Sequence, residues 1–247
     1  MRSEIIDIVT PDGVADAYLS RPDDDTRHPA VLFVIDAIGL RPQIERMADR
    51  IAARGFAVLA PNVFYRAGRA PIVPIPDLTD PDQRSAFIDQ IRPFMAELTP
   101  SNVTRDGGAY LDVLEEVGRG PVAITGYCMG GRVGWRIAAA YPDRVAALAA
   151  FHAGGLVTDQ EDSPHLSAAS LDAELFFGHA DNDHSMSPDD IAALERALDE
   201  AGATYRSELF EGAMHGYTMA DTAAYDEAAA ERHFDELFAL LARTVAA

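Results

Sequence analysis

The chain has 247 residues, a formal net charge of −20 and one cysteine. A single cysteine excludes an intramolecular disulfide, and the excess of acidic residues argues against binding to nucleic acid or to an anionic membrane surface. The N-terminus lacks the basic and apolar regions of a signal peptide, and no apolar stretch is long enough to span a bilayer. We therefore expect a cytoplasmic protein with one domain over residues 1–247, a monomer or a small homo-oligomer, with no cofactor and no metal.

The N-terminal part of the chain is typical of the start of a mostly parallel sheet. Two alternating runs flank the turn signal Pro11-Asp12-Gly13 and predict an antiparallel hairpin. An apolar run, a helical pattern and a second apolar run then predict one β–α–β unit. The expected ranges are strands 4–9 and 14–19 for the hairpin, and strand 30–35, helix 44–54 and strand 56–60 for the unit.

The rest of the chain alternates between helix-like and strand-like segments, as α/β proteins do. Residues 62–81 are irregular and rich in proline, and such a long connection is expected to wall a pocket. The expected helices cover residues 83–98, 103–117, 189–200 and 225–241, and the expected strands cover residues 145–151, 173–178 and 205–210.

The single cysteine lies where a strand-like run passes into a helix-like one. Gly126 and Gly130 stand two residues before and two after Cys128, a pattern typical of the nucleophile elbow, whose strained turn raises the nucleophile above the sheet edge. The unpaired N–H groups at the start of the next helix favour a thiolate or an oxyanion. The alternative interpretation of Cys128 is a small buried apolar side chain.

Two acids and a histidine follow the cysteine, each just after an expected strand. Asp181 and Asp183 follow strand 173–178, and His215 follows strand 205–210. The order nucleophile, acid, histidine is that of the α/β hydrolases. Either aspartate fits the acid's place in this order.

The elbow sequence Gly126-Tyr-Cys-x-Gly-Gly131 resembles that of the dienelactone hydrolase family, the carboxymethylenebutenolidase-like enzymes. The resemblance extends from the apolar strand at residues 30–35 to the C-terminal helix. It implies an α/β-hydrolase fold: a mostly parallel central sheet with helices on both faces, an N-terminal antiparallel hairpin and no separate cap domain. It also implies a hydrolase of small reactive carboxylic esters or lactones that acts through a Cys-His-Asp triad and a thioacyl-enzyme.

The resemblance assigns roles to the triad. The family's Gly-x-x-Asp pattern places the acid at Asp181, so the expected triad is Cys128, Asp181 and His215, with Asp183 as the alternative acid. Cys128 would attack the carbonyl carbon, and His215 would hold its proton.

The resemblance also assigns the oxyanion hole and one further acid. The two N–H donors map to Met129, after the nucleophile, and Ala37, after an acidic residue. That acid is Asp36, where the family usually has Glu, and it is expected to contact the resting thiol. The alternative role for Asp36 is the N-cap of the next helix.

Candidate substrate-binding residues are less sharply defined. His152 ends a strand at the functional edge of the sheet, Arg66 matches a family position, and Met219 replaces an arginine that binds a carboxylate in the family. Arg66, Arg69 and Arg84 could compensate the charge of an anionic substrate, although Arg84 is more typical of a surface arginine. The complete set of expected substrate contacts is Arg66, Tyr127, His152 and Met219. Because Met219 is neutral, we expect a preference for uncharged or larger lactones and esters, and no nucleic acid or membrane partner.

Two other function classes compete with this prediction. One is a ligand-binding protein of the same fold without catalysis, which a missing triad member would have indicated. The other is a thiol acyltransferase or redox enzyme, and the lack of a second cysteine weakens the redox version.

Overall fold

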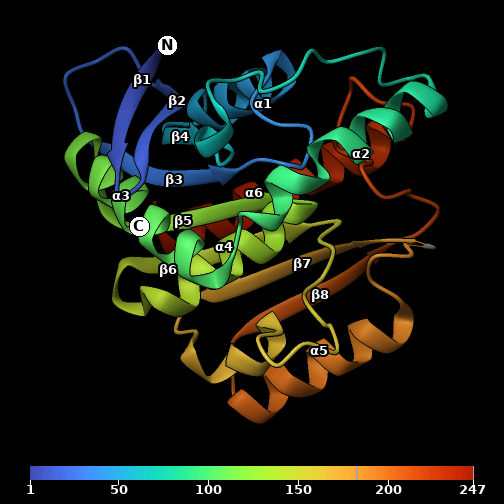
Figure 1. Ribbon diagram of the computed structural model, residues 1–247. Helices are drawn as coiled ribbons and strands as arrows, with labels where there is room; N and C mark the ends of the chain where they lie inside the picture. The colour runs from blue at the N-terminus through green and yellow to red at the C-terminus, as the bar shows by residue number, and fades with distance from the viewer. Residues whose placement is uncertain (182, 247) are drawn as a thin grey trace.

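A central sheet of eight strands organises residues 1–181 and 183–246, which the computed structural model describes (Figure 1). The spatial order is β1-β2-β4-β3-β5-β6-β7-β8. The strands β3 to β8 pair in parallel, and β1 and β2 are antiparallel to their neighbours. Their bounds are β1 Arg2–Thr10, β2 Gly13–Arg21, β3 His28–Val34, β4 Ala57–Pro61, β5 Gly118–Tyr127, β6 Val145–Phe151, β7 Glu174–Ala180 and β8 Tyr205–Phe210.

The expected N-terminal hairpin is confirmed. Thr10 pairs with Gly13 across the turn, and the hydroxyl of Thr10 donates to the carbonyl oxygen of Gly13. The second strand continues into the sheet by pairing with β4, for example Leu19 with Leu59. The hairpin therefore extends the parallel sheet at one edge.

The continuous apolar runs are the strands in the middle of the sheet. All of β4, all but the first residue of β3 and the last six residues of β5 are buried. Both faces of these strands are covered by helices, which is why their sequences are apolar throughout instead of alternating. One continuous core extends from Ile8 to Val245.

The described residues form six longer helices and three short ones, which lie between the strands except for α6, which follows β8. The helix α5 begins with a capping box, in which Ser187 and Asp190 bond each other's backbone N–H groups. The short helix η3 lies in the connection between β6 and β7. Their bounds are α1 Pro42–Ala52, α2 Pro81–Ala96, α3 Pro100–Val117, α4 Met129–Ala140, α5 Pro188–Ala201, α6 Glu227–Thr244, η1 Tyr65–Ala67, η2 Pro142–Arg144 and η3 Pro164–Ser170.

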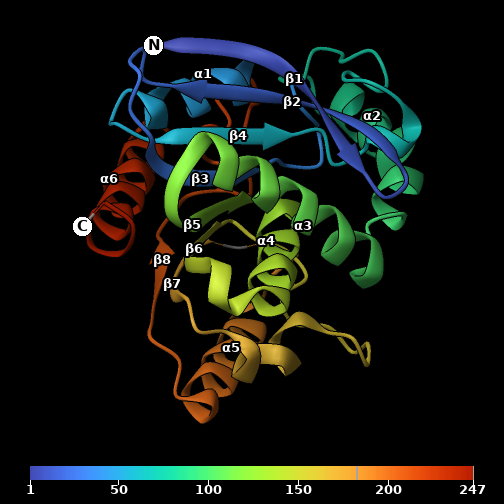
Figure 2. The same ribbon diagram turned by 90° about the vertical axis from the view of Figure 1, so that its left-hand side faces the viewer.

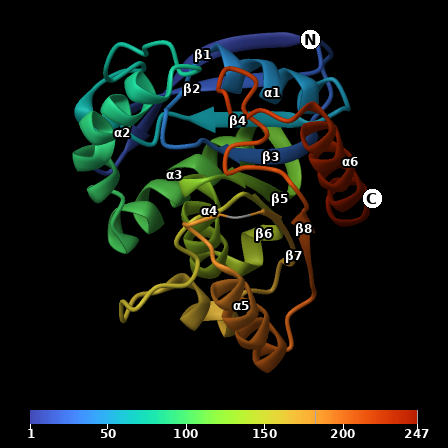
Figure 3. The same cartoon turned by 90° about the vertical axis from the view of Figure 1, so that its right-hand side faces the viewer.

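The helices cover both faces of the sheet. Figure 2 shows α1 and α6 on one side and α3 and α4 on the other, in agreement with the strands that each helix contacts. The helix α2 lies apart from these layers, near the loop that follows β8 (Figure 3). Within the described ranges, no helix is long and apolar enough to cross a membrane.

Candidate active site

Cys128 lies on a strained turn between β5 and α4. Its φ of 54° is in the left-handed region, which costs a residue other than glycine about 1–3 kcal/mol. The glycines on either side are required because backbone atoms leave no room for a side chain. A Cβ added at Gly126 would lie 2.4 Å from the carbonyl oxygen of Gly130, and a Cβ added at Gly130 would lie 2.3 Å from the carbonyl oxygen of Val34. The sequence thus forms the nucleophile elbow, with Cys128 partly exposed.

The imidazole of His215 connects Cys128 to an aspartate. His215 Nε2 lies 3.0 Å from Cys128 Sγ, and His215 Nδ1 lies 2.6 Å from Asp183 Oδ2. The acid comes from the loop after β7 and the histidine from the loop after β8. Two parallel neighbouring strands therefore bring the acid and the base to the same edge of the sheet, beside the elbow.

The expected acid, Asp181, is not the one that contacts the histidine. Its carboxylate accepts the backbone N–H of Gly212 at 3.0 Å, and its own N–H donates to Ala213. Asp181 thus ties the end of β7 to the turn after β8. The loop reaches the imidazole only two residues later, at Asp183, so the assignment from Gly-x-x-Asp was wrong and the alternative acid holds the position.

Ser185 is a residue that the sequence analysis missed. Its hydroxyl lies 2.6 Å from Asp183 Oδ1 and 3.2 Å from His215 Nδ1, and its backbone N–H also donates to that carboxylate at 2.8 Å. These bonds hold the carboxylate facing the imidazole. No pattern distinguishes this serine from an ordinary loop residue, so the sequence offered no signal for it.

The electrostatics favour an ion pair between sulfur and imidazole. Burial alone would raise the pKa of the Cys128 thiol, but the adjacent His215 lowers it below its usual value. Burial alone would lower the pKa of His215, but Cys128 and Asp183 together raise it to about 10. Both directions describe one event, the transfer of the thiol proton to the imidazole.

A cavity of about 260 Å³ opens above the sulfur. Its lining combines apolar side chains with a few polar ones and comes from the loop after β3, from α2 and from the loop after β8. The long connection 62–81, expected to wall a pocket, lines a separate pocket and contributes no residue here, while α2 contributes three. The lining consists of Asp36, Ala37, Ile38, Arg84, Ile88, Met95, Cys128, His152, His215, Gly216, Met219 and Thr222.

The two expected oxyanion donors lie on this side of the sheet. Ala37 lines the cavity, and the backbone N–H of Met129, at the first turn of α4, points toward the Cys128 sulfur and helps to lower its pKa, a smaller effect than that of His215. N–H groups at a helix start have no partner within the helix, so that of Met129 is free for a charged atom.

Asp36 lines the cavity, but its hydrogen bonds come from Arg41 and from the backbone of Ile38, and not from the thiol. Arg41 donates to its two oxygens at 2.7 and 3.0 Å, and the backbone N–H of Ile38 donates at 3.1 Å. The expected contact with the resting thiol is therefore wrong, and so is the alternative of a helix N-cap, because α1 is preceded by Arg41. The sequence analysis assigned no role to Arg41.

Three other residues considered from the sequence reach the cavity. His152 directly follows β6 and packs edge-on against His215 with ring centroids 5.2 Å apart, while its Nε2 lies 2.7 Å from the hydroxyl of Thr218. Met219 also lines the cavity, as expected. Arg84 was expected to be a surface residue rather than a substrate contact, but it lines the cavity, and the described part of the chain gives its Nε no hydrogen-bond partner.

Tyr127 does not reach the cavity, contrary to expectation. Neighbouring residues of a strand point to opposite faces, so the residue before the elbow points into the core. Its ring is fully buried, stacks on Phe33 and Phe151, and its hydroxyl lies 3.3 Å from His233 of α6. Tyr127 is a core residue.

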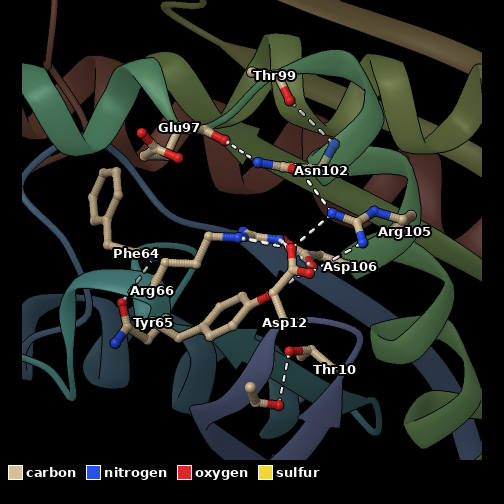
Figure 4. Close-up of polar contacts among 12 residues, drawn as sticks. Thr10, Asp12, Phe64, Tyr65, Arg66, Glu97, Thr99, Asn102, Arg105 and Asp106 are labelled. Atoms are coloured by element: carbon tan, nitrogen blue, oxygen red, sulfur yellow. Dashed lines mark hydrogen bonds and ion pairs between the residues drawn. The ribbon is translucent and has the colours of Figure 1, made fainter.

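Arg66 is also placed away from the catalytic cavity. Its guanidinium bonds Asp106 on α3 at 2.7 and 2.9 Å and Asp12 in the hairpin turn at 2.7 Å (Figure 4). The hydroxyl of Tyr65 reaches the same Asp106 at 2.8 Å. This ion-pair network joins η1 to α3 and to the hairpin. Arg66 therefore has a structural role, and its expected substrate contact is wrong. Arg69 pairs with Asp7 on the surface.

Known proteins resemble the chain in sequence, and a solved structure resembles it in fold. Carboxymethylenebutenolidase homolog of Mus musculus is 29% identical over 207 residues, which cover 81% of this chain and 75% of the mouse protein. Carboxymethylenebutenolidase of Rhodococcus opacus is 26% identical over 201 residues, covering 81% and 74%. A crystal structure from Klebsiella pneumoniae subsp. pneumoniae MGH 78578, described provisionally as a dienelactone hydrolase, superposes with a TM-score of 0.82 at 22% identity and covers 98% of each chain.

The family model for the dienelactone hydrolase family matches residues 15–245, nearly the whole chain. The mostly parallel sheet with its antiparallel hairpin is the α/β-hydrolase fold, as expected from the sequence. The chain therefore belongs to the dienelactone hydrolase family and is a carboxylic ester hydrolase.

Proposed function

We propose that the protein hydrolyses small reactive carboxylic esters or lactones through a covalent thioester on Cys128. One observation carries the proposal: Cys128, His215 and Asp183 form a hydrogen-bonded series with contacts of 3.0 and 2.6 Å, and Cys128 and His215 line a cavity. Nucleophile, base and orienting acid within hydrogen-bond reach are the geometric signature of nucleophilic catalysis.

In the first step, Cys128 Sγ attacks the carbonyl carbon, and the carbonyl π electrons move to the oxygen. The N–H groups of Met129 and Ala37 stabilise the oxyanion. When the oxyanion collapses, the acyl C–O bond breaks, and the imidazolium of His215 gives its proton to the departing oxygen. The product is a thioester on Cys128 and a released alcohol or enol. From a lactone, the released group stays attached to the acyl chain.

In the second step, neutral His215 takes a proton from water, and the hydroxide attacks the thioester carbonyl. The C–S bond then breaks, and a carboxylic acid leaves. The carboxylate of Asp183 stabilises the imidazolium in both steps and keeps Nδ1 protonated, which leaves Nε2 for the reaction. The ion pair of the resting enzyme is thus restored.

The chemistry of sulfur limits the range of substrates. A thiolate is a better leaving group than an alkoxide, so the first tetrahedral intermediate of an ordinary alkyl ester tends to expel the sulfur again. Activated esters and enol lactones release a more stable anion and proceed to the thioester. We therefore assign reactive esters and lactones, and not amides, as the substrate class.

The cavity favours substrates of largely apolar character. Ile38, Ile88, Met95 and Met219 supply apolar surface, and Arg84 is a cation at the wall. We expect the uncharged member of a pair of enol lactones to have the higher kcat/KM. Arg84→Met should lower kcat/KM roughly 10- to 150-fold for the carboxylated member only, because one contact to a charged group contributes about 1.5–3 kcal/mol. A clear preference of the wild type for the carboxylated lactone would refute this substrate assignment.

The proposal is tested with p-nitrophenyl acetate. Wild type should turn over, Cys128→Ala and His215→Ala should not, and brief mixing followed by acid quench should show one acetyl group on the peptide that contains Cys128. Addition of alcohols separates hydrolysis from acyl transfer, since an acyltransferase would form a new ester. Normal turnover in Cys128→Ala, or a wild type that binds lactones without hydrolysing them, would contradict the proposal.

A further inference from the structure

A cluster of three charged side chains, two buried and the third, Asp221, partly exposed, lies beside the proposed nucleophile. Arg41 is 4% exposed and Asp36 is 3% exposed. Arg41 holds both oxygens of Asp36, and its Nε and Nη2 contact the two oxygens of Asp221 at 2.6 and 3.1 Å. Arg41 Nη2 also lies 3.5 Å from Met219 Sδ. One guanidinium thus joins the loop after β3 to the loop that follows His215.

The charge of this cluster acts on the sulfur. Asp36 and Cys128 line the same cavity, and a negative Asp36 opposes the lowering of the thiol pKa by His215. Burial alone would lower the pKa of Arg41, but Asp36 and Asp221 raise it, so the guanidinium stays charged. A buried charge is tolerated when it is paired and hydrogen-bonded, and Arg41 supplies both for Asp36.

Other groups around Cys128 also carry charge or can titrate. His215, from the loop after β8, has the largest charge effect on the sulfur, and Arg132 on α4 is half-buried near it. His152, at the end of β6, is neutral because burial lowers its pKa well below 6.5. Asp183 contacts the imidazole of His215 and affects the sulfur through it. Asp36 is therefore the acid whose negative charge acts on the sulfur without the imidazole between them, and it opposes the thiolate.

We propose that Arg41 is a positioning residue that holds Asp36 off the sulfur and cancels its charge, so that the Cys128–His215 ion pair forms before any substrate binds. This inference rests on the proposed role of Cys128 as nucleophile. The cleft needs no substrate to displace Asp36, because the carboxylate is already turned to Arg41. In chemical terms, the proton of the thiol moves to His215 and not to Asp36.

The test follows the ionisation of Cys128 in the absence of substrate. The rate of alkylation by iodoacetamide is measured against pH, with the ultraviolet absorbance of the thiolate as a second readout. In Arg41→Met the freed carboxylate repels the thiolate, so the apparent pKa of Cys128 should rise by about one unit and alkylation below that pKa should slow about tenfold. The double variant Arg41→Met, Asp36→Asn should return the profile to that of wild type.

The matched control is Asp221→Asn, which leaves the pair of Arg41 and Asp36 in place and should not shift the profile. A role of Arg41 that was only structural would lower the melting temperature in both Arg41 variants without moving the alkylation profile. An unshifted profile in Arg41→Met, or no rescue in the folded double variant, overturns the proposal. Should Arg41→Met fail to fold, Asp36→Asn alone still decides, because a rise in the Cys128 pKa there would overturn it.

Failure of the proposed function gives a different result. If Cys128 of the wild type ionises only like an ordinary cysteine, and no acetyl-enzyme forms, then the nucleophile itself is wrong. If the wild type alkylates readily at low pH and forms the acetyl-enzyme, but Arg41→Met behaves identically, only the role of Arg41 is wrong.

Discussion

Exchange of Asp183 for Asn tests the acid that the structure places in the triad. Asp183 is buried, and its carboxylate bonds both the imidazole and the Ser185 hydroxyl. An asparagine keeps the shape but carries no charge, and its NH₂ group facing Nδ1 would favour the tautomer with the proton on Nε2. That tautomer cannot accept the thiol proton.

The magnitude follows from what the carboxylate stabilises. Asp183 helps to raise the pKa of His215 to about 10, against the effect of burial. Loss of the charge and of the correct tautomer should cost about 4–5.5 kcal/mol in the barrier, a decrease of roughly 10³ to 10⁴ in kcat, with little change in KM. The alkylation profile of Cys128 should also move to higher pH, because a less basic imidazole stabilises the thiolate less.

The control is Asp181→Asn, two residues earlier in the same loop. Its side-chain oxygen can still accept the N–H of Gly212, so kcat should change less than threefold and the melting temperature only slightly. Both variants are assayed with the same activated ester and checked for folding by circular dichroism. A large loss of kcat in Asp181→Asn together with an active Asp183→Asn would refute the assignment.

Three further predictions concern stability. Gly130→Ala places a Cβ 2.3 Å from the carbonyl oxygen of Val34, so the free energy of unfolding measured in urea should fall by about 3 kcal/mol or more. A variant as stable as the wild type would contradict this close contact. Arg66→Met leaves the buried Asp106 without its cation and should cost about 3–5 kcal/mol, while an altered KM would show that Arg66 does reach substrate. Burial lowers the pKa of His233 to about 3, so below about pH 6.5 this histidine is protonated in the unfolded state and neutral in the folded state. Between pH 7 and pH 5 it should therefore lower the free energy of unfolding by about 2 kcal/mol. The His233→Gln variant should lose less stability over that interval.

The parts of the fold that depend on local pattern were predictable from the sequence. The hairpin, the buried parallel strands and the elbow each have a period, a glycine or an apolar run that identifies them. The elbow was the most secure, because Gly126 and Gly130 are required by backbone packing that no other residue allows.

The parts of the site that depend on loop conformation were not predictable. Asp181 and Asp183 are two residues apart in a loop, and only its path decides which reaches His215. Tyr127 and Arg66 matched expected positions, but strand direction and partners on distant elements place them in the core and in an ion-pair network. Arg41 was missed because its role needs Asp221, which lies 180 residues away.

The packing of Gly130 against the carbonyl of Val34 means that different parts of the protein position the nucleophile and form the cavity wall. The sulfur is located by main-chain atoms of the two central strands, whereas the cavity wall comes from α2 and from two loops outside the sheet. Residues such as Ile88, Met95 and Met219 could therefore be exchanged, or α2 replaced by a helix of different sequence, without moving the nucleophile. A library confined to that wall should yield new substrate ranges at a constant rate of Cys128 alkylation, so selectivity can diversify while the reacting group stays fixed.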